Sequence, residues 1–205
     1  PVSPNWIKSA GNYIVYANAT DPDAQGVSSV TATTGIVGGA TTSFSLSASA
    51  GTCAGVSYAY TSAVRTGPTL TGSQTFFADV VASDAAGNAA DTNLAQSADV
   101  GVDVVAPGLV TVSHTHALLS SVIKLNWTAA TETGSGLAGY QLKVYNSGTT
   151  TPATQYPNPV VVSGSTLTYS FTLTYLSTYD FVVTPVDNAG NNGPAATHNG
   201  VLDGL

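Results

Sequence analysis

One stretch decides the fold: YDFVVTPVDNAGN, residues 179–191. Its first half alternates, with Tyr179, Phe181 and Val183 on one face and residues 180, 182 and 184 on the other. This two-residue period is typical of a half-buried strand. The Asp, Asn and Gly that follow favour a tight turn, because Asp and Asn bond their own backbone and Gly accepts a positive φ. The stretch therefore predicts one strand that runs directly into one turn.

The same pattern occurs once more, as FFADVVASDAAGN over residues 76–88. The turn aspartates, Asp84 and Asp187, are 103 residues apart. That spacing matches the size of one β-sandwich and is too long for a solenoid repeat. We therefore expect two tandem domains, 1–106 and 107–205. The boundary is placed at Ala106-Pro107, because proline cannot extend a ladder and stiffens a short connector.

Composition favours an all-β chain. Hydrophobic residues make up 43% of the sequence and charged residues only 7%, so each half can bury a core while Ser and Thr replace the usual surface charges. The many Thr, Val and Tyr residues favour strands over helices. Strands are expected at 13–17, 27–33, 44–48, 56–63, 75–83 and 98–104 in the first half, and at 109–113, 123–127, 140–145, 167–173 and 179–184 in the second.

Charge excludes several partners. The net charge is −7 with four basic residues, which argues against nucleic acid and against an electrostatic membrane anchor. No apolar run approaches the ~20 residues of a membrane span, so membrane insertion is not expected. The one cysteine, Cys53, cannot form a disulfide within the chain. A chain that begins at Pro1 and lacks Met is expected to be a processed product or a piece of a longer polypeptide.

The second half resembles a fibronectin type III domain. The resemblance covers most of residues 107–205 and rests on LNW at 125–127, GLAGY at 136–140, LSTY at 176–179, FVV at 181–183 and DNAGN at 187–191. It implies that Tyr179 is the corner tyrosine, whose hydroxyl bonds to backbone a few residues upstream. Pro185 departs from the family, which favours a small residue there, and it suggests that the strand is already ending.

The first half resembles a bacterial immunoglobulin-like module. The matching pieces are DPDAQGV at 21–27, DAAGN at 84–88 and VDVVAP at 102–107, and Phe76 stands where a corner tyrosine is expected. The expected fold is therefore two tandem Ig-like/fibronectin type III-like β-sandwiches. The resemblance implies a module of a large secreted or surface-anchored prokaryotic protein, such as a spacer, stalk, adhesin, surface-layer subunit or accessory domain of a secreted enzyme.

Calcium is the first candidate ligand. Asp21, Asp23, Asp84, Asn88 and Asp103 are expected to gather at one end of the first sandwich, and calcium takes six to eight oxygen ligands of these kinds. A site at Asp103 would stiffen the connector between the domains. A second, weaker set is Glu132, Asp187 and Asn191. The alternative is that these Asp and Asn residues only form turns.

Other chemistry has less support. His114 and His116 share a face of a strand and can chelate zinc, but no third ligand is evident and His198 is distant in sequence, so we interpret both as surface histidines. No Gly-x-Ser-x-Gly elbow and no His-Glu-x-x-His motif occurs. Glu132 is the only Glu and has no partner carboxylate beside it in the sequence for glycoside chemistry. We predict that the chain is not an enzyme.

The interpretation is a structural or adhesive module of an extracellular or cell-surface filament, stalk, surface layer or adhesin. Its expected partners are copies of itself or neighbouring repeat domains, reached by pairing exposed edge strands or by donating the arm that contains Trp6. The first alternative is binding of a glycan or a host protein through outward rings of Tyr16, Tyr58, Tyr60, Tyr145 and Tyr156. The second is an accessory segment of a secreted hydrolase.

Overall fold

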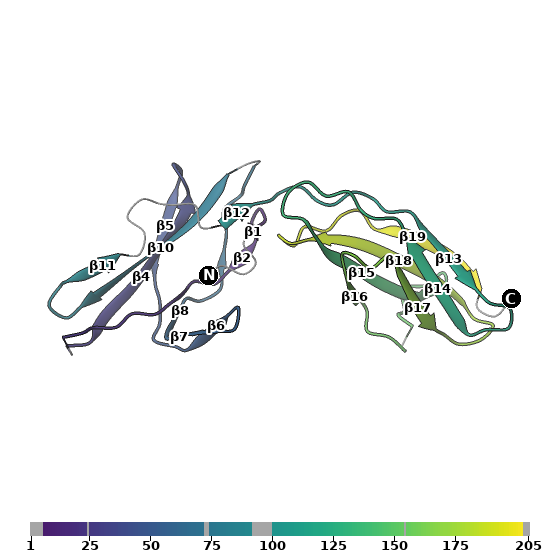
Figure 1. Ribbon diagram of the computed structural model, residues 1–205, viewed down its shortest axis with the longest axis horizontal. Helices are drawn as coiled ribbons and strands as arrows, with labels where there is room; N and C mark the ends of the chain where they lie inside the picture. Colours follow the sequence, from purple (N-terminus) through teal and green to yellow (C-terminus); the bar gives the residue numbers. More distant parts are fainter. Residues whose placement is uncertain (1–5, 24, 72–73, 92–99, 154, 203–205) are drawn as a thin grey trace. The chain divides into compact units, whose positions relative to one another are not determined.

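The computed structural model describes residues 6–23, 25–71, 74–91, 100–153 and 155–202 (Figure 1). These residues form strands, turns and loops, with no helix among them, and they accordingly include no helix able to span a membrane. The chain divides into two compact units, Pro1–Val104 and Val105–Leu205. The division falls two residues before the boundary expected at Pro107.

Unit 1 contains one six-stranded sheet. Its strands follow the order β1-β12-β10-β4-β5, and β11 pairs with β10 off this path. Three two-stranded pairs accompany the sheet: β2-β9, β3-β8 and β6-β7. The strands of unit 1 are β1 (Trp6–Ile7), β2 (Asn12–Tyr13), β3 (Tyr16–Ala17), β4 (Val27–Ile36), β5 (Thr41–Ser45), β6 (Gly51–Cys53), β7 (Val56–Tyr58), β8 (Tyr60–Thr61), β9 (Arg65–Thr66), β10 (Thr75–Asp84), β11 (Ala89–Asp91) and β12 (Val100–Val102).

Two small apolar clusters form the core of unit 1. One gathers alternate residues of β4, Val30 and Ala32, against Phe44 of β5 and its neighbours. The other surrounds Phe76 at the start of β10. The strand expected over 13–17 is two short strands with different partners, because Tyr13 pairs with β9 and Tyr16 with β8. Residues 98 and 99 of the last expected strand lie outside the described residues.

The segment that we expected as a donated arm is part of its own sheet. Trp6 and Ile7 form β1, which pairs in parallel with Gly101 and Val102 of β12. Ile7 is buried, and a Cβ added at Gly101 would lie 2.7 Å from the Trp6 ring. The missing side chain of Gly101 is therefore what lets the indole lie against β12. Trp6 and Ile7 therefore pair within their own chain in this structure, and residues 1–5 lie outside the described part of the chain.

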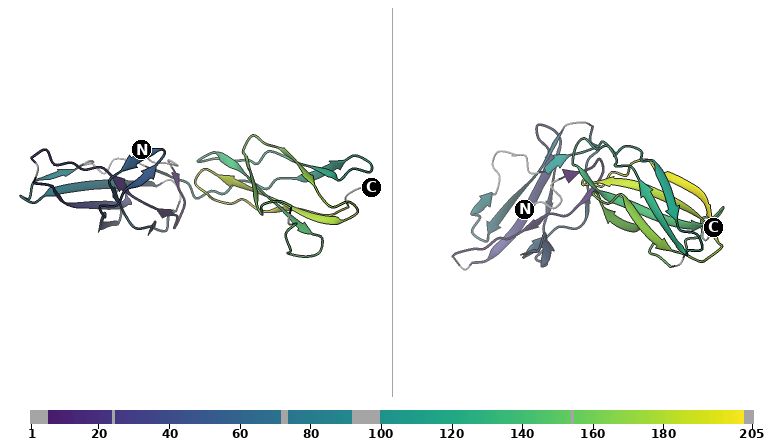
Figure 2. Two further views of the ribbon diagram at one scale, coloured as in Figure 1. Left: turned by 90° about the horizontal axis from the view of Figure 1, so that it is seen from below. Right: turned by 45° about the vertical axis from the view of Figure 1, so that its right-hand side comes forward.

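Unit 2 is built from two sheets that pack face to face (Figure 2). One sheet has the order β13-β14-β17 and the other β16-β15-β18-β19. Phe171 of the first sheet contacts Phe181 of the second, with ring centroids 5.5 Å apart. The strands are β13 (Val112–His116), β14 (Val122–Trp127), β15 (Leu137–Asn146), β16 (Val160–Ser163), β17 (Thr168–Thr172), β18 (Thr178–Asp187) and β19 (Ala196–Leu202).

The strand β18 contains the stretch that predicted the fold. Tyr179, Phe181 and Val183 are each at most 2% exposed, so the predicted inward face is confirmed. The Tyr179 hydroxyl accepts a hydrogen bond from the backbone N–H of Thr174, at 3.1 Å. This is the corner bond that the fibronectin resemblance implied.

Pro185 does not end the strand, contrary to the expectation. The strand β18 continues to Asp187, and Pro185 lies opposite Tyr140 of β15. In a strand, the N–H and C=O of one residue point to the same side. The carbonyl of Pro185 accepts from Gly193, so its missing N–H faces the segment before β19 begins. Proline is tolerated there because the ladder with β19 starts only at Val183.

Candidate functional site

The two repeated turns have the same hydrogen bonds. In unit 1 the carboxylate of Asp84 accepts from the backbone N–H of Asn88 at 2.9 Å and from its side-chain amide at 2.7 Å. Gly87 has a φ of 91°, which explains why glycine occupies that position. The Asn88 amide, together with backbone N–H groups of Asn88, Ala86 and Gly87, holds the pKa of Asp84 below its ordinary value. Asp84 is half-buried, and its carboxylate serves its own turn.

In unit 2 the carboxylate of Asp187 accepts from the backbone N–H and the side-chain amide of Asn191, both at 2.7 Å. Unlike Asp84, Asp187 is only 2% exposed. The turn is covered by the loop before β15: the Asn188 side chain donates to the carbonyl of Ser135, and the N–H of Ala189 donates to the Ser135 hydroxyl. The aspartate of the repeated turn is therefore half-buried in unit 1 and buried in unit 2.

The five residues proposed for calcium do not all gather in one place. Asp21 accepts from the N–H groups of Asp23 and Gly26, at 3.0 and 2.7 Å. Its loop leads into β4 at Val27, which is paired with Asp84. The loop 21–26 and the turn 84–88 therefore share one end of the β4–β10 pair.

Asp103 lies at the other end of the same sheet. It follows β12, which pairs with Thr75 and Phe76 at the start of β10. The eight residue-to-residue steps from Phe76 to Asp84 span roughly 26 Å in an extended strand. Asp103 therefore cannot join Asp21, Asp23, Asp84 and Asn88 in one site, and the expectation of a shared end is wrong for this residue. The error arose because sequence alone did not give the direction in which β12 returns.

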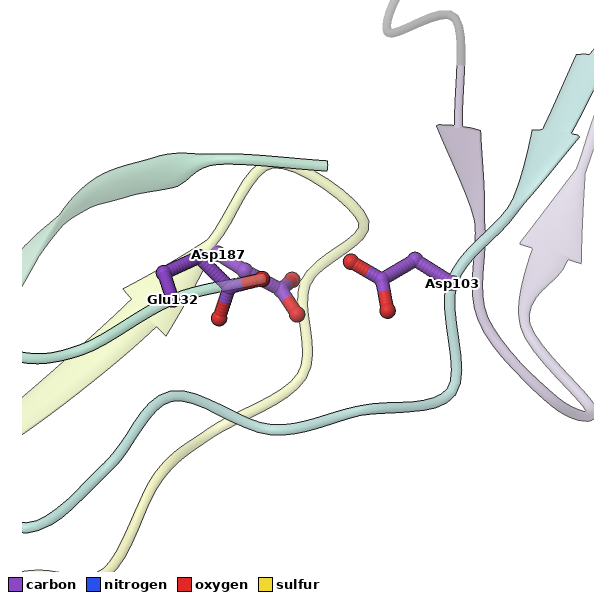
Figure 3. Close-up of side chains that lie close together, drawn as sticks. All are labelled: Asp103, Glu132 and Asp187. Atoms are coloured by element: carbon purple, nitrogen blue, oxygen red, sulfur yellow. The ribbon is translucent and has the colours of Figure 1, made fainter. Parts of the chain in front are cut away.

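A pair of carboxylates occurs within unit 2, at Glu132 and Asp187. Oxygens of the two side chains lie within 4.8 Å of each other (Figure 3). Glu132 comes from the loop before β15, and Asp187 ends β18. Together with Asn191, which is bonded to Asp187, they are the weaker set named from the sequence. Two like charges this close repel each other, and a cation between them would relieve that repulsion. Figure 3 also labels Asp103, which belongs to unit 1.

The tyrosines proposed as a glycan platform are half-buried. Tyr16 and Tyr58 pack on each other, with centroids 5.8 Å apart, and Tyr156 packs edge-on against Phe171 at 4.9 Å. The Tyr156 hydroxyl accepts from the backbone N–H of Thr172. Tyr60 and Tyr145 are also half-buried. These rings mainly stabilise the fold, which weakens the case for sugar stacking.

Known structures share this fold. The FN1–FN3 domains of chicken CNTN1 are similar with a TM-score of 0.57 and 15% identity, over 98% of this chain and 62% of that one. The fibronectin(III)-like modules of Clostridium thermocellum CbhA give a TM-score of 0.49 and 15% identity, over 94% of this chain and 85% of theirs. This chain thus spans less than two thirds of the CNTN1 structure. No protein-family model and no curated protein matches the sequence.

The likeness shows the fold: an all-β chain of the immunoglobulin and fibronectin type III class. At 15% identity the likeness carries no ligand or partner to this chain.

Proposed function

We propose that this chain is a non-catalytic structural module of a secreted or cell-surface prokaryotic protein, and that it associates with copies of itself through strand edges. The observation that supports this proposal is the edge strand β5. It pairs only with β4 among the described strands. Its sequence, TTSFS, contains no charged residue and no proline. Edge strands of monomeric proteins usually carry such residues, because an open row of N–H and C=O groups recruits other strands.

The side chains of β5 leave this edge accessible. Phe44 is buried against β4, while Thr41, Thr42, Ser43 and Ser45 are exposed. In an antiparallel pair, alternate residues direct both backbone groups away from the partner, so a five-residue edge offers two or three of them. A second copy of β5 can bond to these groups. The net charge of the chain is −7, but β5 itself carries no charge that would repel a second copy of this edge.

Sedimentation velocity over a range of concentrations tests the proposal. The wild-type chain is expected to associate as concentration rises. The double variant Thr41→Lys, Ser45→Lys places two charges on the outer face of the edge without touching Phe44, and it is expected to stay monomeric.

The matched control is Thr20→Lys, Ala50→Lys, which adds the same charge at exposed loop positions of the same unit. It is expected to associate like the wild type. A wild-type chain that remains monomeric at millimolar concentration would refute self-association. Loss of association in the control as well would show that net charge, and not the β5 edge, is responsible.

We also propose that calcium binds to unit 2. The pair Glu132 and Asp187 with the amide of Asn191 supplies oxygens of the type that calcium prefers, and backbone carbonyls and water complete its six to eight ligands. Calcium there would stabilise unit 2 by neutralising the two carboxylates. Equilibrium dialysis at millimolar calcium tests this, and binding unchanged by Glu132→Gln would contradict the assignment.

A further inference from the structure

All three histidines of the chain meet at one edge of unit 2. His114 and His116 are alternate residues of β13, and His198 lies on β19. His114 and His198 are 84 residues apart in sequence, yet Nδ1 of one lies 2.7 Å from Nε2 of the other. The sequence shows no third ligand close to His114-x-His116. In the structure, β19 packs beside β13 and brings His198 to that position.

The strands explain why these rings converge. Each strand is the last of its sheet, and the two strands are in contact (Figure 1). His114 lies opposite Leu125, and His116 opposite Ile123; both partners are fully buried, so these imidazoles point to the inner face of their sheet. His198 lies opposite the buried Phe181 of the other sheet.

The three imidazoles therefore close one open edge of the sandwich, where apolar side chains are the usual choice. All three are half-buried, so an ion can reach them from solvent.

The ring geometry brings the His114 and His198 imidazoles within chelating distance of each other, with His116 beside them. The His114 and His116 rings are parallel, with centroids 5.6 Å apart, and the His114 and His198 centroids are 4.9 Å apart. Zinc binds imidazole nitrogen at about 2.0–2.1 Å, so two tetrahedral ligand nitrogens are roughly 3.3 Å apart. Small rotations of the His114 and His198 side chains open the observed 2.7 Å contact to that spacing. The three side chains do not place one nitrogen each within 4.8 Å of the others, so the His116 ring has to turn further before it can share the ion.

We propose that His114, His116 and His198 form a site for a divalent first-row transition ion, with Zn²⁺ as its occupant. Three imidazoles and a water in the fourth position give zinc a tetrahedral set. Imidazole nitrogen also suits Cu²⁺ and Ni²⁺, whereas Mg²⁺ and Ca²⁺ prefer oxygen. The ion ties β13 to β19, and so links the two sheets at an edge where no ladder hydrogen bonds join them.

Titration of the full chain with ZnCl₂ tests the site, using protein without a polyhistidine tag. Calorimetry is expected to give one Zn²⁺ per chain. His198→Gln and His116→Gln are each expected to weaken binding by roughly tenfold or more, since even residues that only support metal ligands contribute that much. The control, Thr115→Gln with Asn199→Gln, alters exposed neighbours on the same two strands and is expected to bind like the wild type.

NMR of the imidazole nitrogens gives a readout that does not depend on whether a variant folds. In the wild-type chain, zinc is expected to shift signals from all three histidines together, and MgCl₂ is expected to shift none. Absence of zinc binding by the wild type, or binding that leaves the imidazole signals unmoved, would overturn the proposal. So would equal affinity in the folded histidine variants and the control; the three rings would then be a hydrogen-bonded aromatic cluster only.

Discussion

The charge pair in unit 2 gives the sharpest prediction for stability. Oxygens of Glu132 and Asp187 lie within 4.8 Å of each other. Two unit charges at that distance repel by about 3.5 kcal/mol at an effective dielectric constant of 20. Glu132 is half-buried as a residue, but both of its carboxylate oxygens are buried, so solvent screens little of this energy. In EDTA, the isosteric change Glu132→Gln is therefore expected to stabilise unit 2 by about 1–3 kcal/mol.

Each unit contains one tryptophan, so tryptophan fluorescence can follow the unfolding of one unit at a time. The chain has two tryptophans, Trp6 in unit 1 and Trp127 in unit 2. In a Trp6→Phe background, the buried Trp127 reports unfolding of unit 2 alone. Urea unfolding followed by its fluorescence gives the free energy of unfolding. A domain of this size shifts its midpoint by about 4–8 °C per kcal/mol, so thermal unfolding also detects the change.

A double-mutant cycle decides whether the effect comes from the pair. In an Asp187→Ala background, Glu132→Gln is expected to have little effect, because the partner charge is gone. Asp187→Ala by itself removes two hydrogen bonds to Asn191, each worth about 1.5–3 kcal/mol net for a charged acceptor, and this loss is offset by the relief of repulsion.

Calcium in hundredfold excess over its dissociation constant is expected to stabilise the wild type by about 2.7 kcal/mol, and Glu132→Gln by much less. Destabilisation by Glu132→Gln in EDTA, or a coupling energy near zero in the cycle, would refute this electrostatic reasoning.

Two further predictions use the same fluorescence assay. Tyr179→Phe removes the hydroxyl that accepts from Thr174 and is expected to cost about 1–2 kcal/mol, while the exposed Tyr175→Phe is expected to cost nothing; equal effects would contradict the corner bond. Backbone N–H groups of Gly200 and Gly148, with the Ser147 hydroxyl, lower the pKa of Asp180. The stability from this carboxylate is therefore present above its unfolded pKa, near 3.9, and is lost as the pH falls through the lower folded value. Asp180→Asn should make unit 2 less stable at neutral pH, and its difference from the wild type should shrink below about pH 4. A difference that is constant from pH 7 to pH 2 would argue against these bonds.

Local features were predictable from the sequence. The alternation in residues 179–183 gave the buried face of β18, and the Asp-x-x-Gly-Asn spacing gave two turns with the same hydrogen bonds. These features depend on residues within about five positions of each other, which is the range that side-chain period and turn chemistry describe.

Features set by strand order were not predictable. The candidate site in unit 1 failed for Asp103 because the return of β12 to the start of β10 depends on long-range pairing. His198 was set aside as distant in sequence, although the pairing of β19 with β18 brings it to His114. Pro185 was interpreted from its missing N–H alone, and the side to which that N–H points depends on where β19 begins. One feature of the sequence could have pointed to the histidine cluster: all three histidines lie in unit 2, on stretches with a strand-like composition.

Hydrogen exchange along β5 tests the central proposal most directly. Amide exchange is measured for the wild-type chain at micromolar and at millimolar concentration. If copies associate through this edge, amides within residues 41–45 that are open at low concentration become protected at high concentration, and the Thr41→Lys, Ser45→Lys variant shows no such change. Association without added protection in β5 would contradict edge pairing at this strand, and an unchanged exchange pattern with no association would contradict self-assembly itself.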